Sequence, residues 1–588
     1  MNETLHLNST ASGLGAGGAP GTSKNTGLER RAGRTFLGAG AIVGLVWLIY
    51  WPDLHGSWLW DDGYEVAHNS LLRNPAGLVK IWTGQGALDY FPLKATVQWI
   101  LWRIWGANPT GWHAFSIALH GMNALLLWRL LHRLGLRQAW IGGLLFAVHP
   151  LAVESVAWVA ELKNLLSLPL VFLSFGAYLD YDERGRSFDL WRAALLFLAA
   201  MLCKSTVVML PCLLVLFLWW KHGTRGWRRR WSLVPFFAVA LGLGLVTVWF
   251  QHQRAIGAAD VAVGGMATRL ARAGLALLFY AWKTVWPIEL MPVYPRWPVS
   301  PPAVHQFLAW PILGAFFGWL WLKRNGWGRH VLFGAGAFVL NLAPILGFLA
   351  MAYMHASWVA DHFVYAALPA AAGLFAGGVD AAVLRLAGPM RHFAATALAA
   401  LLVILVTLSW SYARIFRSPA DFWSYAVEHN PDSSVAHNNL GNVFFAARQP
   451  TEAARHFAAA VRLEPGNAGM RINWGNALAE LGRTNEAIRQ HEMAVTAAPA
   501  SAVALNSLGG TLLDAGRLTE ARQHFESALR LQPDSAEARN NLGIVLARTG
   551  ALTEARAHFE AAVRLNPGLN SARENLRLLE QQVARPPK

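Results

Sequence analysis

Residues 35–69 read TFLGAGAIVGLVWLIYWPDLHGSWLWDDGYEVAHN, and they place two adjacent carboxylates shortly after a long apolar run. The run predicts a membrane-spanning helix, because a hydrocarbon core about 30 Å thick takes about 20 apolar residues in a helix. Trp58 and Trp60 follow it, and tryptophan rings concentrate at the level of the lipid headgroups. The sequence therefore predicts that Asp61 and Asp62 lie at a membrane surface beside the first span.

The composition predicts a polytopic membrane protein with a further domain. The chain has 588 residues, of which 54% are hydrophobic and only 14% charged. Its formal net charge of +16 comes largely from short basic blocks between apolar runs, which indicates membrane topology and not nucleic-acid binding. Cys203 and Cys212 are the only cysteines, which excludes a disulfide framework and a cysteine zinc site.

Apolar runs predict about eleven membrane spans. They lie near residues 35–51, 113–131, 138–152, 164–180, 190–203, 205–220, 232–250, 306–322, 331–350, 363–379 and 394–412. The loops after alternate spans are basic and mark the cytoplasmic side, and acidic residues gather in the opposite loops. Residues 94–107 and 272–287 are expected to lie along the outer interface, and residues 1–34 to form a disordered cytoplasmic tail.

A repeat of 34 residues begins after residue 418. Its markers are Pro431, Pro465, Pro499, Pro533 and Pro567, then Gly441, Gly475, Gly509 and Gly543, then Ala453, Ala487, Ala521 and Ala555. This period is typical of tetratricopeptide repeats (TPR), which are pairs of antiparallel helices. The predicted fold class is all-α, with a membrane domain over residues 35–413, about four repeats with a capping helix over residues 418–583, and a short tail at 584–588.

The two carboxylates after the first span are the first candidates for chemistry. Two neighbouring like charges raise the pKa of one partner, so one of Asp61 and Asp62 could act as a base while the other holds a cation or a substrate hydroxyl. Ordinary acidic residues in an outer loop are the alternative.

Three later outer loops bring further ionisable groups to the same side of the membrane. They contain His149, Glu154 and Lys163; then Lys204; then Asp361, His362 and Tyr365. Ionisable groups at membrane depth are costly and are candidates for function, although Lys204 could simply extend to the interface and Asp361 with His362 could be a surface ion pair. Lys163, Lys204 and His362 suit a phosphate, and Asp61, Asp62 and Glu154 suit a hydroxyl or a metal ion, so the mixture fits a lipid-phosphate substrate.

Several segments resemble a known family. YFPLKATVQW, LLFAVHPLAVESVAWVAELKNLLS, CKSTVVMLP, FYAWKTVWPIELMPVYP and ADHFVYAALP occur in the order seen in the transmembrane and TPR-containing O-mannosyltransferases. These are polytopic glycosyltransferases of the GT-C class, and TPR repeats follow their membrane domain too. Phe91, Ser205 and His362 depart from residues frequent in the family and resemble a bacterial branch.

The resemblance implies an enzyme of a bacterial inner membrane, with a cytoplasmic N-terminus and a periplasmic TPR array. It implies transfer of a mannose-like sugar from a polyprenyl-phosphate donor to a protein Ser or Thr, with inversion. Asp61 would be the base, Asp62 its neighbour for the acceptor or for Mg²⁺ or Mn²⁺, and Glu154 the acid of the second loop. Lys204 and His362 would lie near the donor phosphate.

Asparagines recur in the repeats and could bind an extended peptide. They are Asn439, Asn473, Asn506, Asn541 and Asn575. A side-chain amide can pair with peptide backbone whatever its sequence, and this pattern resembles the asparagine ladder of another TPR-bearing glycosyltransferase. Asparagine is also common at this place in TPR helices generally.

Two other functions remain open from the sequence. A non-enzymatic TPR scaffold anchored in the membrane would need one span, which leaves the many spans and the charged outer loops unexplained. A transporter would be expected to carry paired inverted repeats and charges near the middle of the membrane, and neither is evident in the sequence.

Overall fold

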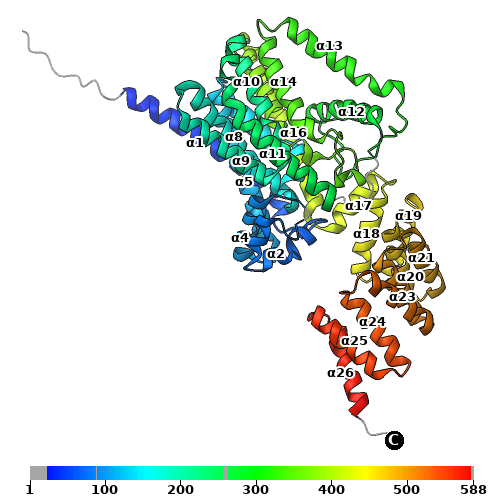
Figure 1. Cartoon of the computed structure of the whole chain (residues 1–588). Helices are drawn as coiled ribbons and strands as arrows, with labels where there is room; N and C mark the ends of the chain where they lie inside the picture. The colour runs from blue at the N-terminus through cyan, green and yellow to red at the C-terminus, as the bar shows by residue number, and fades with distance from the viewer. Residues whose placement is uncertain (1–22, 88, 256–262, 585–588) are drawn as a thin grey trace, which may run out of the picture.

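The computed structural model describes residues 23–87, 89–255 and 263–584, and within these ranges it contains helices and no β-strand. Figure 1 shows the helices of the first two thirds of the chain gathered into one body, from which helices α17 to α26 lead away towards the C-terminus. The all-α fold class is confirmed.

Seven segments of the described residues are long and apolar enough to span a membrane. They are Thr35–Asp53, Pro109–Arg133, Val159–Arg184, Ser205–His222, Arg229–Arg254, Leu368–Arg385 and Pro389–Arg417. A helix pair, Ala139–Val148 with Pro150–Ala157, is bent by 60° and would be an eighth span if it crosses as one. The corresponding helices are α1 (Ser23–Tyr50), α5 (Pro109–Arg133), α6 (Ala139–Val148), α7 (Val153–Ala157), α8 (Leu162–Arg184), α10 (Leu210–His222), α11 (Val234–Phe250), α15 (Leu368–Arg385) and α16 (Pro389–Ala413).

Each of the eleven predicted spans contains a helix, and seven or eight of the segments have the length and hydropathy of a full span. The helices α9 (Ser187–Cys203), α13 (Ala309–Leu322) and α14 (Gly328–Leu342) have 17, 14 and 15 residues. Each is shorter than the helix of about 20 residues that crosses a hydrocarbon core. Apolar residues counted from the sequence partly lie outside helices. For example, α14 ends at Leu342 because Pro344 lacks a backbone donor; Ala343–Ile345 form a 3-10 turn, and residues 346–350 are not helical.

Two further differences concern the N-terminal part. Helix α1 begins at Ser23, so the end of the predicted tail is helical, and residues 1–22 lie outside the described residues. The segments expected along the interface are helical, as α4 (Pro92–Trp105) and α12 (Met266–Val285), and two short helices, α2 (Ser70–Arg73) and α3 (Gly77–Thr83), precede them.

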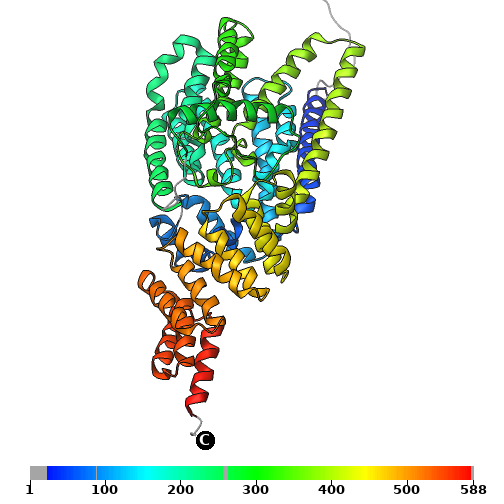
Figure 2. The same ribbon diagram turned by 90° about the vertical axis from the view of Figure 1, so that its right-hand side faces the viewer.

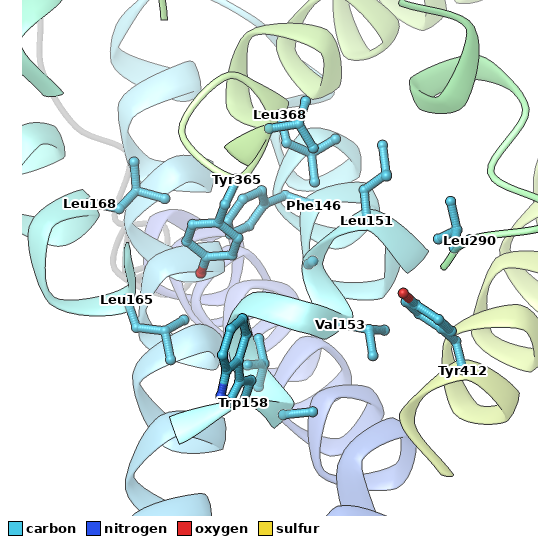
Figure 3. Close-up of a cluster of buried hydrophobic side chains, with 14 of the residues drawn as sticks. Phe146, Leu151, Val153, Trp158, Leu165, Leu168, Leu290, Tyr365, Leu368 and Tyr412 are labelled. Atoms are coloured by element: carbon cyan, nitrogen blue, oxygen red, sulfur yellow. The ribbon is translucent and has the colours of Figure 1, made fainter. Parts of the chain in front are cut away.

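The hydrophobic core of the membrane part surrounds the break between α6 and α8. Figure 3 shows Trp158, Tyr365 and Tyr412 around the short segment that carries Val153. The same core continues through Phe416 into Trp423, so the start of the repeat array packs against the membrane part without a gap in the apolar contacts.

The array consists of ten helices in the described part of the chain. They are α17 (Pro419–His429), α18 (Ser434–Ala446), α19 (Pro450–Leu463), α20 (Ala468–Glu480), α21 (Thr484–Ala497), α22 (Ala502–Asp514), α23 (Leu518–Leu531), α24 (Ala536–Arg548), α25 (Leu552–Leu565) and α26 (Asn570–Ala584). Figure 2 shows them as a series of stacked helices that ends far from the membrane helices.

Two structural features recur with the 34-residue period and explain which residue types repeat. Ser433, Asn467, Ser501 and Ser535 are the N-caps of successive first helices, and each side chain accepts a hydrogen bond from a backbone amide three residues later. The recurring glycines allow close helix contact: a Cβ at Gly509 would lie 2.7 Å from the ring of Phe525 in the next helix. The repeats therefore need glycine where an aromatic ring crosses.

A matched pair of glycines tests this explanation. Gly509→Ala is expected to destabilise α22 and α23 by about 1–3 kcal/mol, because the new methyl group overlaps the ring of Phe525. Gly510→Ala is expected to stabilise α22 by about 0.5–1 kcal/mol, because no atom lies within 4 Å of its Cβ and alanine favours the helix. Hydrogen exchange of the peptides covering both helices, in the whole protein, measures the difference. Equal effects of the two substitutions would contradict the explanation.

Candidate active site

A cavity of about 990 Å³ lies where several loops of the membrane part meet. Residues 61–98 form one wall, residues 158–163 and 204–209 and His362 another, and α11 with residues 343–353 a third. The third wall is mainly apolar, and its Leu241 and Leu245 are 66% and 61% exposed. The cavity thus has a charged end and an apolar side that reaches the exposed face of α11.

Five alternating charges connect the first two walls at the charged end. Lys94 pairs with Glu65 at 2.5 Å, and Glu65 lies 3.8 Å from Lys163. Lys163 pairs with Glu161 at 3.0 Å, and Glu161 pairs with Lys204 at 3.1 Å. We call these five residues the charge chain. Its members come from separate segments, so the ion pairs fix the position of one wall relative to another.

Glu161 is the centre of the charge chain. It is 2% exposed, and its second oxygen also accepts a hydrogen bond from Asn164 at 2.7 Å. Lys204 in turn donates to the Asn164 side-chain oxygen at 2.6 Å. A buried charge is tolerated only when such partners compensate for its lost hydration, so Glu161 and Lys204 depend on each other.

Asp61 lines the cavity, as predicted for a base. Burial raises the pKa of its carboxyl to about 6, Lys163 opposes this rise, and Glu65 adds to it. The hydroxyl of Tyr64 donates a hydrogen bond to the carboxylate. A carboxylate with this pKa is ionised at neutral pH and is a stronger base than an ordinary aspartate.

Asp62 does not line the cavity, in contrast to the predicted pair. Its two oxygens accept hydrogen bonds from the backbone amides of Leu59 at 2.9 Å and Ala160 at 2.6 Å. Burial raises the pKa of Asp62 to about 8 although these donors lower it. The residue joins the loop after α1 to the loop before α8, because the chain turns at Asp61 and sends consecutive side chains in different directions.

The two carboxylates of the predicted pair also differ in their hydrogen-bond partners. Both oxygens of Asp62 are occupied by amide donors, and among the described residues no group of three His, Cys, Asp or Glu side chains could hold a metal. Asp61 faces the cavity and Asp62 does not, so the two carboxylates do not face the same space.

Glu154 lies behind the cavity and orients His362. One carboxylate oxygen accepts from the backbone amide of His362 at 2.8 Å, and the other lies 3.2 Å from Nδ1 of its ring. The opposite ring nitrogen, Nε2, lies 3.9 Å from Glu161 on the cavity side. Glu154 therefore supports a residue of the cavity wall and does not reach the cavity itself.

Three other candidates lie in the core and not at the cavity. Asp361 accepts hydrogen bonds from the hydroxyls of Tyr294 and Tyr412, and burial with the nearby Glu154 raises its pKa. Tyr365 bonds to Nδ1 of His120 at 2.9 Å. His149 caps the bend between α6 and α7 and contacts the carbonyl of Thr284 at 3.0 Å.

The structure also brings residues to the cavity that the sequence reasoning did not select as site residues. Lys94 and Glu65 are both part of the charge chain, and so is Glu161. Burial alone would raise the pKa of Glu65, but Lys94 and Lys163 outweigh burial and hold it below its usual range. The available signal was weak: Glu65 follows Asp61 by four residues, and Lys94 lies in a Trp-rich helix that was expected to lie along the interface.

The repeat asparagines bond to one another between neighbouring repeats. Asn473 donates to Asn438, Asn541 to Asn506, and Asn575 to Asn540, at 3.0, 3.1 and 2.9 Å. Asn439 bonds instead to the carbonyl of Val435 in its own helix. The series is interrupted where Ser507 and Ile472 stand at the corresponding positions. Each of these bonds uses one amide donor, and the amide group has two.

Comparison with known proteins finds tetratricopeptide repeats in the C-terminal part of the chain and similarity to protein O-mannosyl-transferases. Residues 423–468, 438–502, 472–536 and 506–570 match the family model described as Tetratricopeptide repeat. The chain is similar to the human Protein O-mannosyl-transferase TMTC1, with 30% identity over 197 residues, which are 30% of this chain and 22% of that protein. It is 27% identical over 199 residues to the mouse Protein O-mannosyl-transferase TMTC4, which are 28% of this chain and 27% of that protein. The resemblance to this family is confirmed, and the chain spans less than a third of the length of either relative.

Among solved structures, the similar ones include two smaller proteins. The crystal structure of MamA has a TM-score of 0.24 and 19% identity, and the match covers 25% of this chain and 86% of that one. YrrB, a TPR protein described as having an unusual peptide-binding site, has a TM-score of 0.24 and 24% identity, over 28% of this chain and 84% of that one.

The different surroundings of the two aspartates lead to a prediction for stability. Asp62→Asn is expected to lower the free energy of unfolding by about 1–3 kcal/mol, because its NH₂ group would face a backbone amide that needs an acceptor. Asp61→Asn is expected to change it little, because the substitution removes a charge that burial disfavours. Thermal unfolding of the purified variants compares them. A larger loss for Asp61→Asn would contradict this assignment.

Proposed function

We propose that this protein is a membrane glycosyltransferase. It moves a mannose-like hexose from a polyprenyl-phosphate donor to a Ser or Thr hydroxyl of a protein on the periplasmic side of a bacterial inner membrane. The observation that carries the proposal is one cavity that combines a half-buried carboxylate, three lysines and an apolar wall. The similarity to protein O-mannosyl-transferases supports the same class of reaction.

The donor fits the two kinds of lining. A polyprenyl chain is apolar and would lie along α11 at Leu241 and Leu245. The phosphate would lie at the lysines of the charge chain, with His362 beside them. Each ammonium group has three donors, and the glutamates use only part of these, so phosphate oxygens can add to the ion pairs without displacing them.

The cavity residues divide the reaction between them. Asp61 accepts the proton of the acceptor hydroxyl while the hydroxyl oxygen forms a bond to the anomeric carbon of the sugar. The bond from that carbon to the phosphate oxygen breaks, and its electron pair leaves with the lipid phosphate. Lys94, Lys163 and Lys204 stabilise the negative charge on the leaving phosphate. A single displacement inverts the anomeric centre.

The TPR array would present the acceptor. The first helix of each repeat carries the paired asparagines. The second N–H of each side-chain amide can donate to the backbone of an extended peptide. The array begins at α17, which packs in the same core as the membrane part. An acceptor bound along the array would therefore be held next to the domain that contains the cavity.

Loss of the base tests the enzymatic role. Asp61→Asn is expected to lower sugar transfer from a lipid-linked donor at least about 100-fold, because an amide cannot accept the hydroxyl proton. In the unsubstituted protein, transfer is expected to rise as pH increases through about 6, because the carboxyl must be ionised to act as a base and burial raises its pKa to that value. Transfer of radiolabelled sugar to protein, measured from pH 5 to 8, reports both.

Asp534→Asn is the matched control, since Asp534 is exposed in a turn of the array. It should leave transfer unchanged. Full activity of Asp61→Asn would rule out the proposed base.

The proposed role of the lysines leads to a separate prediction for the KM of the lipid donor. Lys204→Met removes a charge-assisted hydrogen bond to the phosphate, which is worth about 1.5–3 kcal/mol, so KM for the lipid donor is expected to rise about 10- to 100-fold. Lys323→Met, at an exposed position after α13, is the control. Steady-state kinetics with varied donor and varied acceptor concentrations measure the KM of each substrate separately. A change confined to the acceptor KM would place the phosphate elsewhere.

A further inference from the structure

Trp60 stands directly before the proposed base and has an unusual backbone conformation. Its φ angle is 34°, in the left-handed region that bulky residues rarely adopt. Such a conformation is retained only when surrounding contacts enforce it, and it is often found at functional sites. The contacts that hold Trp60 therefore also determine where the chain places Asp61.

Those contacts come from two different parts of the molecule. On one side the Trp60 ring stacks on Trp158, a residue of the cavity wall, with centroids 5.3 Å apart and planes at 8°. On the other side it meets the edge of Trp423 in α17, the first helix of the array, at 5.0 Å and 67°. Tyr353, also in the cavity wall, lies 6.0 Å away.

Backbone hydrogen bonds hold the same loop at both ends. The amide and hydroxyl of Ser57 donate to the carbonyl of Arg417, just before α17, at 3.0 and 3.3 Å. At the other end, Asp62 accepts from Ala160 next to Glu161. The loop 57–62 is thus fixed between the start of the array and the wall of the cavity.

Trp423 is suited to transmit a movement. It is 2% exposed and packs against Phe422 and the core that continues into the membrane part. Helix α17 is also held by Tyr425, whose hydroxyl donates to the carbonyl of Leu290, and by Asn430, which donates to the carbonyl of Val293. A tilt of α17 would move the edge of Trp423 against the Trp60 ring.

We propose that the repeat array is part of the active site, because α17 sets the position of Asp61 through the contact of Trp423 with Trp60. Trp60 and Trp423 are positioning residues, and acceptor binding on the array is coupled to the base through them. This inference rests on the proposed function for its kinetic part, whereas the mechanical coupling stands on the contacts alone.

The test uses variants of the whole protein. Trp423→Leu keeps much of the apolar volume and removes the ring contact, Trp423→Phe keeps an aromatic edge, and Trp191→Ala removes an exposed tryptophan on α9 as a control. Hydrogen exchange of the peptide covering residues 57–66 reports the coupling without any activity. The kinetic readouts are kcat, the donor KM and the pH at which transfer reaches half of its maximum.

For Trp423→Leu we expect faster exchange at residues 57–66 and a kcat at least about 10-fold lower with an unchanged donor KM. We also expect the half-maximum to shift below pH 6, because a looser loop exposes Asp61 to water. Trp423→Phe should give exchange, kcat and a pH of half-maximal transfer close to those of the unsubstituted protein. Trp191→Ala should change none of the three.

Two results separate the coupling from the enzyme. Unchanged exchange in Trp423→Leu, or a loss of kcat without a shift of the pH profile, would overturn the inference, because packing alone would not move the titration of Asp61. Absence of sugar transfer by the unsubstituted protein would refute the proposed function, and the exchange experiment would then decide the coupling by itself.

Discussion

The burial of Glu161 between Lys163 and Lys204 is the constraint on which the rest of the site depends. Burying one uncompensated charge in this part of the molecule would cost several kcal/mol, so the loop before α8 and the turn after α9 have to meet. Glu65 then connects Lys163 to Lys94 and brings the loop after α1 and helix α4 to the same place. These ion pairs hold two walls of the cavity at fixed distances around space that a substrate can fill.

The second structural condition is the continuous core between the membrane part and the array. Phe416, Phe422 and Trp423 extend the apolar contacts of the last span into the first repeat helices. The array is therefore packed directly against the membrane part and is not joined to it by an extended linker. Its first helix shares a tryptophan cluster with the loop that carries Asp61, which gives a physical route between the proposed docking surface and the proposed base.

Much of the architecture could be predicted from the sequence because it depends on local periodicity. The 34-residue repeat follows from N-caps such as Ser501 and from glycines such as Gly509 that a crossing ring requires. The limits of the spans are less predictable than their existence, because hydropathy counts apolar residues outside helices, such as those after Leu342, together with those in helices.

The site was predicted only in part, for a reason that concerns side-chain direction. Asp61, Lys163, Lys204 and His362 line one cavity, and each could be selected from the sequence as an ionisable group at the end of an apolar run. Asp62 and Glu154 had the same signal, but they turn inward to bind backbone amides. Lys94 could not be assigned, because its partner Glu65 is 29 residues away in the sequence and their contact arises only on folding.

The most direct test of the account is to locate the lipid donor on the protein. A polyprenyl-phosphate sugar with a photoreactive group near the phosphate end would be bound to the purified protein, irradiated, and the labelled peptides identified by mass spectrometry. The account predicts labels in residues 92–98, 158–163 and 204–209, reduced by excess unlabelled donor and by Lys204→Met. Labels confined to the exposed surface of α13, insensitive to both, would contradict the claim that this cavity binds the donor.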